Sequence, residues 1–201
     1  MEQLRMIHKM KELPEYTLAE GFTLRMYQPG DEPAWTEICS YGLLNPEDLE
    51  EGWNKCMVVF ETLVPERDVY FICDKTGKPV ATCTAFALSD DVCLLHMLGA
   101  LPEARGHRLA TSMTAYGVCK MAKEMPAEDK MMRLKTAEDK MMRLKSDDFR
   151  VSAVRTYLQC GFQPVLFDTG MQERWAAICD KLDIHGVEML DDDGNPTGVI
   201  L

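Results

Sequence analysis

The chain has 201 residues, of which 46% are apolar and 27% are charged, with a formal net charge of -11. This length and composition predict one soluble globular domain with a sizeable core rather than two ordinary domains. The excess of acidic side chains repels a phosphate backbone, which argues against broad nucleic-acid binding. Charge is mixed throughout the N-terminal stretch and apolar runs are short, so we expect no signal peptide, no membrane partner and a cytoplasmic location.

The first predicted elements are a strand and a helix. Residues 21–27, GFTLRMY, alternate in polarity and precede the turn QPGD. Asp31 is placed to cap the following helix, with Pro33 in the first turn. Three apolar side chains would then share one helical face: Trp35, Ile38 and Cys39. A second helical stretch is expected to begin near Pro46.

The middle of the chain predicts a three-stranded antiparallel meander. Two apolar runs within residues 69–86 flank DKTG at 74–77, the composition of a tight hairpin turn. A third run, VCLLHMLGAL at 92–101, ends at Pro102. From Arg105 to Met125 the apolar residues recur at helical spacing, so a helix should follow the meander.

A nine-residue repeat, AEDKMMRLK, occupies residues 127–135 and 137–145. Helix and strand differ about twofold in rise per residue. If both copies had the same secondary structure, the elements that follow them in the chain would be displaced. We expect the copy at 137–145 to supply a strand and the copy at 127–135 to form an extra helical turn or an exposed loop. The alternative is that one copy is a cloning scar.

The C-terminal part alternates helices and strands. Residues 151–162, VSAVRTYLQCGF, predict a helix that ends at Gly161, and QPVLFD at 163–168 predicts a strand. Residues 171–182 predict an amphipathic helix, and 187–201 a hairpin. One face of that helix would be buried through four residues: Trp175, Ile178, Cys179 and Leu182.

No metal site is expected. Eight cysteines are scattered without a C-x-x-C pair, mostly in apolar segments, which favours reduced, structural thiols. The aspartates at 191–193 do not match a calcium loop, because Pro196 stands where such a loop requires glycine. We expect them to form a turn.

The stretch LPEARGHRLATSM at 101–113 places Arg105, His107 and Arg108 at the start of a predicted helix. The first N–H groups of a helix lack intrahelical partners and favour anions, so this junction predicts a site that a pyrophosphate would fit. The alternative is an exposed basic helix start with no ligand.

The order of these parts resembles the GNAT superfamily of N-acetyltransferases over roughly residues 20–168. RGHRLA at 105–110 is similar to the family's R/Q-x-x-G-x-G/A loop, which holds the pyrophosphate of coenzyme A, and AVRTYLQCGF at 153–162 is similar to its second signature. The resemblance implies a mixed α/β fold of α+β type, with a mostly antiparallel sheet flanked by helices. It implies an acetyltransferase domain over 1–168, including an N-terminal segment 1–20, and a helix-hairpin extension over 169–201 packed on the same domain.

The resemblance also implies which residues hold the coenzyme. The loop would bind phosphates mostly through its backbone, and the strand before it would pair with the pantetheine arm; Gly99 in that strand is also typical of a bulge or of a close backbone approach. Arg108 departs from the family, which has glycine there, and Arg150 stands where many members have asparagine. The predicted coenzyme-binding residues are Leu98, Gly99, Ala100, Arg105, Gly106, His107, Arg108, Leu109, Ala110 and Thr111.

Two residues carry the expected chemistry. The resemblance implies that Tyr157 is the general acid toward the coenzyme A sulfur and that His96, like a histidine in the arylalkylamine N-acetyltransferase branch, is the general base, as its ordinary pKa of about 6.5 allows. The alternative for both is a buried core side chain. Cys93 and Cys160 have no evident activating partner, so we expect direct transfer rather than a cysteine nucleophile.

The sequence thus predicts an acetyl-CoA-dependent N-acetyltransferase that acts on the amine of a small molecule, without a metal. The alternative, favoured by Arg108, is a degenerate acyl-CoA-binding regulatory or interaction module. The acceptor is not identified: Asp48, Glu51 and Trp53 suit a cation, but equally suit a solvated helix face. The acidic C-terminal hairpin is a candidate homodimer contact.

Overall fold

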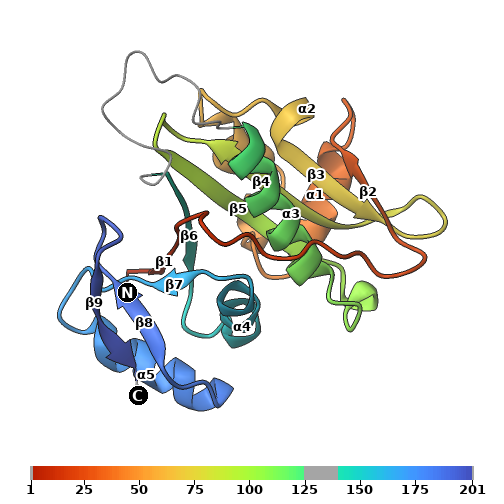
Figure 1. The fold of residues 1–201 in the computed structure, drawn as a ribbon. Coiled ribbons are helices and arrows are strands. Elements are labelled where there is room, and N and C mark those ends of the chain that lie inside the picture. The colour runs from red at the N-terminus through yellow and green to blue at the C-terminus, as the bar shows by residue number, and fades with distance from the viewer. Residues whose placement is uncertain (1, 125–139, 201) are drawn as a thin grey trace.

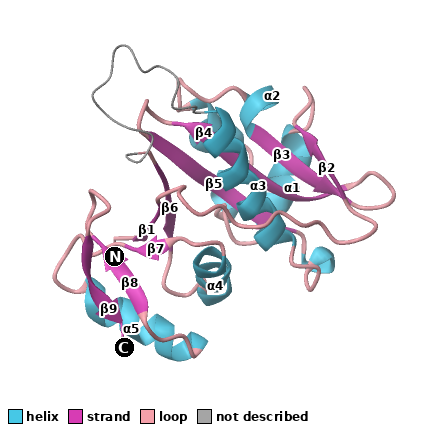
Figure 2. Cartoon of the chain, in the orientation of Figure 1, coloured by secondary structure: helices cyan, strands magenta, loops and turns pink. Residues whose placement is uncertain are grey.

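The computed structural model describes residues 2–124 and 140–200, and in this part of the chain a seven-stranded sheet lies between helices, with a two-stranded hairpin beside it (Figures 1 and 2). The strands are β1 Leu4–His8, β2 Thr23–Met26, β3 Val69–Cys73, β4 Pro79–Ala87, β5 Val92–Ala100, β6 Met141–Ser146, β7 Gln163–Pro164, β8 Val187–Leu190 and β9 Pro196–Ile200. The helices are α1 Glu32–Ser40, α2 Pro65–Asp68, α3 Leu109–Glu124, α4 Val151–Gln159 and α5 Met171–Leu182.

The sheet has the order β2-β3-β4-β5-β6-β1-β7, and only the β5–β6 pair is parallel among the described strands. The predicted mixed, mostly antiparallel fold is therefore confirmed. Helix α1 packs on one face of β4 and β5, and α3 packs on the other (Figure 1). None of the helices in the described residues has the length and apolar character needed to span a bilayer.

The predicted meander is confirmed as β3, β4 and β5. All five residues of β3 are buried, and so are seven of the nine in β4, because both strands are covered by helices on two sides. The connecting turn is closed by Asp74, whose carboxylate accepts hydrogen bonds from the N–H groups of Thr76 (2.8 Å) and Lys78 (3.1 Å). Gly77 has the expected positive φ of 87°.

The second copy of the repeat supplies β6, as predicted. Its MMRLK residues, 141–145, lie between β5 and β1, with Met142 and Leu144 buried. The prediction for the copy at 127–135 lies outside the described residues. A sequence that favours helix in isolation therefore becomes a strand when neighbouring strands are available on both edges.

Helix α1 buries Trp35, Ile38 and Cys39 as predicted, but Asp31 does not cap it with its side chain. The Asp31 carboxylate is instead held by the guanidinium of Arg25, at 2.6 and 2.8 Å, and by the N–H of Gln28. The helical stretch expected near Pro46 does begin there, but it is irregular: a 3₁₀ turn spans Pro46–Asp48 and a π-helical turn spans Asn54–Val58.

Strand β1 was not predicted, because the charged and polar residues in LRMIH interrupt the apolar pattern that indicates a strand. It lies between β6 and β7, in the interior of the sheet, whereas β2 is at the far edge. The connection 9–22 must therefore cross the sheet, and Figure 1 shows it passing along α3. It is held there by the Cys119 thiol, which lies 3.3 Å from the Pro14 carbonyl, and by the rings of Tyr16 and Tyr116, 5.6 Å apart.

The C-terminal part follows the prediction closely. Helix α5 spans Met171–Leu182 and buries its predicted apolar face against the same core cluster as the sheet. The β8–β9 hairpin is present, and its turn is closed by Asp191, which accepts hydrogen bonds from the N–H groups of Asp193 and Asn195. The strand expected over 163–168 is shorter: only β7 pairs with β1, and Val165 then bridges to Leu190.

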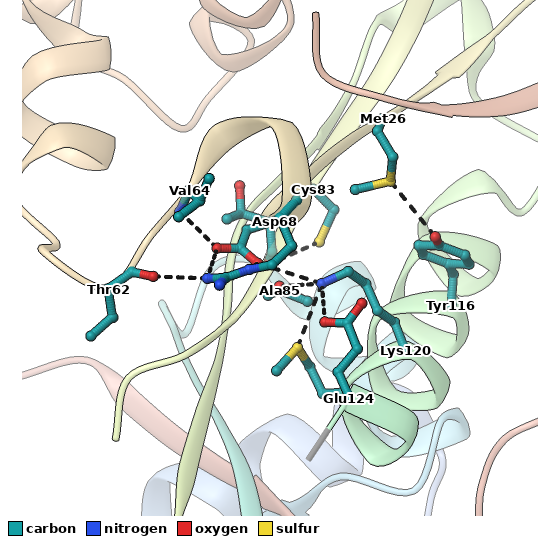
Figure 3. Close-up of polar contacts among 12 residues, drawn as sticks. Met26, Thr62, Val64, Asp68, Cys83, Ala85, Tyr116, Lys120 and Glu124 are labelled. Carbon is teal, nitrogen blue, oxygen red and sulfur yellow. Dashed lines mark hydrogen bonds and ion pairs between the residues drawn. The ribbon is translucent and has the colours of Figure 1, made fainter. Parts of the chain in front are cut away.

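A group of charged side chains is paired between α2, β4 and α3 (Figure 3). Asp68, 1% exposed, accepts two hydrogen bonds from Arg67 (2.8 and 2.7 Å) and one from the N–H of Val64 (2.8 Å). The Lys120 ammonium lies 3.5 Å from this carboxylate, 2.8 Å from Glu124 and 3.3 Å from the carbonyl of Ala85. These contacts fix the end of β4 to α2 and α3.

Candidate active site

The strands β5 and β6 separate along their length. They pair from Val92 with Met141 to Leu94 with Arg143, and no described strand pairs with the remaining β6-facing edge of β5. The main-chain groups of Leu98, Gly99 and Ala100 therefore lie beyond the β5–β6 pairing, as the resemblance implied. An extended ligand with amide groups can pair with such an edge.

The bulge in β5 is not at Gly99. The β4–β5 register shifts between Thr82 and Thr84, opposite Met97, which has a positive φ of 50°. Gly99 is instead required by packing, because a Cβ there would lie 2.9 Å from Leu43 Cδ1 and 3.3 Å from Ile38 Cγ2. The close approach is to α1 and the residues that follow it, on the face opposite α3.

The predicted anion loop is exposed and has an unusual backbone. A 3₁₀ turn, Pro102–Ala104, follows β5, and α3 begins at Leu109 rather than at Arg105 as predicted. Gly106 and Arg108 both have positive φ, 87° and 55°. Alternation of this kind turns successive N–H groups toward one side, which makes an anion-binding concavity.

The N–H groups of residues 106–111 have no acceptor among the described residues. The prediction needs one correction, because the N–H of Arg105 donates to the carbonyl of Pro102 at 3.2 Å and is not free. Six consecutive donors are then available at the start of a 16-residue helix, together with the positive end of its dipole.

Arg108 has a left-handed backbone conformation, which glycine adopts without strain. A left-handed φ costs a non-glycine residue about 1–3 kcal/mol, so the surrounding loop imposes it. The side chain is exposed, and its charge acts on the nearby thiol of Cys160. The arginine at this position therefore places a cation beside the loop.

A first cavity, here called the loop cavity, has a volume of about 460 Å³ and lies against this loop. The crossing connection 9–22 forms one wall of it, which the sequence did not indicate, and Phe22 packs on His107 with 4.9 Å between ring centroids. Its lining residues are Pro14, Glu15, Thr17, Leu18, Ala19, His107, Arg108, Thr111, Ser112, Gln159 and Cys160.

A second cavity, here called the strand cavity, has a volume of about 420 Å³ and lies where β5 and β6 separate. It brings His96 and Tyr157 to one site, although they are 61 positions apart in the chain. Its lining residues are Gln3, Leu43, Phe60, Leu88, Leu94, Leu95, His96, Met97, Leu98, Lys145, Arg150 and Tyr157.

His96 lies on the α1 side of the sheet, against Phe60. Its Nε2 is 3.0 Å from the carbonyl oxygen of Cys56, which can only accept, so Nε2 carries the hydrogen and Nδ1 is the atom that can take a proton. Burial lowers the pKa of His96, and the Cys56 carbonyl opposes this shift only in part. The imidazole is therefore neutral at pH 7.

Tyr157 lies on α4 and is 7% exposed, with its ring on Phe162 at 6.0 Å. Its hydroxyl has no hydrogen-bond partner in the described part of the chain, and the residue lines the strand cavity. Burial raises the pKa of Tyr157 well above its ordinary value. The phenol stays protonated at neutral pH and can donate its proton.

Other sequence candidates lie outside the two cavities or have no reactive state. Asp48 and Glu51 pair with Lys55, and Trp53 stacks on Tyr27. Burial raises the pKa of the Cys93 thiol to about 12 and that of Cys160 to about 11, so neither is a thiolate at neutral pH. The described residues contain no group of three or more histidine, cysteine, aspartate or glutamate side chains able to hold a metal ion.

Comparison with known proteins identifies the family. Residues 34–162 match the acetyltransferase (GNAT) family, and this match spans more than half of the chain. The chain therefore belongs to the GNAT acetyltransferase family. A comparison with curated proteins finds no match.

Solved structures support the fold. A GCN5-related N-acetyltransferase from Sphaerobacter thermophilus is 18% identical, with a TM-score of 0.58 over 81% of this chain and 48% of that one. A GNAT-family acetyltransferase from Colwellia psychrerythraea is 14% identical, with a TM-score of 0.57 over 81% of this chain and 52% of that one. The chain thus spans about half the length of these proteins, and at this identity the likeness shows the fold alone.

Proposed function

We propose that the protein is an acetyl-CoA-dependent N-acetyltransferase that moves an acetyl group to the amine of a small molecule by direct attack in a ternary complex. The observation that carries this proposal is the position of α4. Tyr157 of this helix lines the strand cavity with His96, and the neighbouring Gln159 and Cys160 line the loop cavity. A thioester carrier with a diphosphate at one end and a reactive acyl group at the other needs two such regions side by side.

The loop cavity fits a diphosphate. Three residues of the 106–111 segment line this cavity, His107, Arg108 and Thr111, and their N–H groups have no acceptor among the described residues. Glu15 is the only carboxylate among the described lining residues. A negative ligand at a helix start with free N–H groups is stabilised by both hydrogen bonds and the helix dipole. Acetyl-CoA, when bound, supplies a thioester whose carbonyl carbon is open to attack by an amine.

The residues of the strand cavity supply the proton transfers. The amine nitrogen forms a bond to the acetyl carbon, and its proton goes to Nδ1 of His96. The bond from that carbon to sulfur breaks, and the departing sulfur takes the proton of the Tyr157 hydroxyl. The proton on His96 then returns to the Tyr157 oxygen through solvent, which restores both groups.

The test combines binding and turnover. Calorimetry with coenzyme A measures binding, and release of free thiol from acetyl-CoA over a panel of primary amines measures transfer. Tyr157→Phe should lower kcat by about a hundredfold and leave the coenzyme A affinity within about twofold, whereas the control Tyr116→Phe should retain kcat. In the wild type, kcat/KM should rise with pH through a pKa below 6.5, the ordinary histidine value, and His96→Ala should remove this limb.

The outcomes separate the alternatives. Binding without thiol release for any amine would favour an acyl-CoA-binding module over an enzyme. An unchanged kcat in Tyr157→Phe would remove Tyr157 as the general acid. Absence of coenzyme A binding would overturn the proposal as a whole.

A further inference from the structure

The face of the sheet that carries His96 also carries a lysine. Leu94 of β5 pairs with Arg143 of β6, so these two side chains point to the same face, and the next residues on that face are His96 and Lys145. Both line the strand cavity. The side chain of Lys145 is exposed and makes no hydrogen bond or ion pair with another described residue.

The charge of the strand cavity is positive, although the protein as a whole is acidic. Lys145 and Arg150 are its charged lining residues, and no carboxylate is among the lining residues that the structure describes. Arg150 already has a carboxylate partner: its Nη2 lies 3.1 Å from Asp147 and also donates to the carbonyl of Gly42 at 2.9 Å. Lys145 is therefore the lining cation whose charge no described carboxylate balances.

The rest of the cavity wall is apolar. Leu43 and Phe60 come from the segments that follow α1, Leu88 follows β4, and Leu94 and Leu98 belong to β5. Burial of apolar ligand surface against these side chains contributes about 25 cal/mol per Å² before the costs of association. A purely polar acceptor would leave this wall without a partner.

We propose that the acceptor is an amine that carries both an apolar group and a carboxylate, the chemistry of an apolar amino acid. The carboxylate binds Lys145, the apolar side chain lies against Leu43, Phe60 and Leu88, and the amine faces His96. This inference rests on the proposed function and names its substrate class. The cations of the cavity also oppose a positive charge on the bound amine, which favours the neutral amine that attacks.

The experiment uses matched acceptors that differ only in the carboxylate: phenylalanine against phenethylamine, and leucine against 3-methylbutylamine. Thiol release from acetyl-CoA gives kcat/KM for each. We expect the wild type to prefer the amino acid of each pair by about tenfold or more. Lys145→Gln should lower kcat/KM about tenfold for the amino acids only, and the control Lys181→Gln, an exposed lysine at the end of α5, should change neither.

Several results would overturn the inference and leave the proposed function intact. These are a wild-type preference for the simple amines, or an equal loss for both members of a pair in Lys145→Gln. If no acceptor releases thiol, calorimetry with phenylalanine and phenethylamine in the presence of coenzyme A decides. Selective binding of phenylalanine that Lys145→Gln removes would support the acceptor site while the transfer function fails, and equal or absent binding of both would refute it.

Discussion

The two ends of β5 differ in whether the polar groups around them have partners within the protein. Near Val92, β5 is paired with β4 on one side and with β6 on the other. Beside the end of β4, the buried Lys120 forms ion pairs with Asp68 and Glu124 (Figure 3). Beyond Leu94 the edge facing β6 is unpaired, and the loop after Ala100 leaves six N–H groups without acceptors among the described residues. Polar groups that only hold the fold are paired within the protein, whereas those left free are available to a ligand.

The largest expected effect is a loss of stability when the ion pairs beside the end of β4 are broken. Asp68→Asn removes the carboxylate charge that faces Arg67 and the buried Lys120. Breaking a buried ion pair leaves a charge poorly compensated, so we expect the free energy of unfolding to fall by about 3 kcal/mol. Urea denaturation measures this.

The control is Glu51→Gln, which removes an exposed partner of Lys55 and should have no measurable effect on stability. The coenzyme A affinity of folded Asp68→Asn should equal that of the wild type. If Asp68→Asn were as stable as the wild type, the paired group would have no structural role.

A second effect comes from His8, which ends the buried strand β1. Its ring is 2% exposed, packs on Phe162 and accepts a hydrogen bond from the N–H of Met10 at 2.8 Å. Burial lowers the pKa of His8 to about 4. The unfolded chain, with an ordinary histidine pKa of about 6.5, then binds more protons than the folded one between these values.

The stability from neutral His8 is therefore fully present above about pH 6.5 and is lost as the pH falls toward 4. The full loss is about 3 kcal/mol. Urea denaturation of the wild type and of His8→Gln at several pH values isolates this contribution as the difference between them. The same substitution at an exposed histidine, His185→Gln, is the matched control.

The smallest expected effect is a change of stability in the loop that follows β5. Arg108→Gly relieves a left-handed conformation at a non-glycine residue, so the free energy of unfolding should rise by about 1 kcal/mol. Arg108→Ala keeps the unfavourable φ and should bring no such gain. Thermal or urea unfolding of the two variants measures the difference.

The same two variants also test whether the loop backbone or the Arg108 side chain binds coenzyme A. If the loop holds a diphosphate through its N–H groups, coenzyme A affinity should stay within about fivefold in both variants, since the lost cation is an exposed one. A far larger loss in both would show that the Arg108 side chain, rather than the backbone, holds the ligand.

Several features of the fold could be predicted because they depend on neighbours in the chain. The DKTG turn, the apolar face of α5 and the end of α4 at Gly161 follow from turn chemistry and helical spacing. The RGHRLA loop could be placed at the start of a helix on the same grounds, although the helix begins at Leu109.

Other features required contacts between distant segments. From the sequence, Gly99 was interpreted as a bulge or a close backbone approach within its strand. The structure shows that a side chain there would collide with Leu43 and Ile38. The place of β1 inside the sheet, and with it the wall that residues 14–19 form at the loop cavity, depends on pairing with β6 and β7.

The sequence by itself determined the local elements, the loop with its free N–H groups and the two titratable residues, because propensity, turn type and helix ends act over a few residues. Only the tertiary structure decided that His96 and Tyr157 share a cavity and that Lys145 makes this cavity cationic. The physical reason is that cavities and their charges arise where strands separate and distant side chains meet. Strand pairing is set by long-range packing, and for this reason MMRLK could become β6 within a repeat whose composition favours helix.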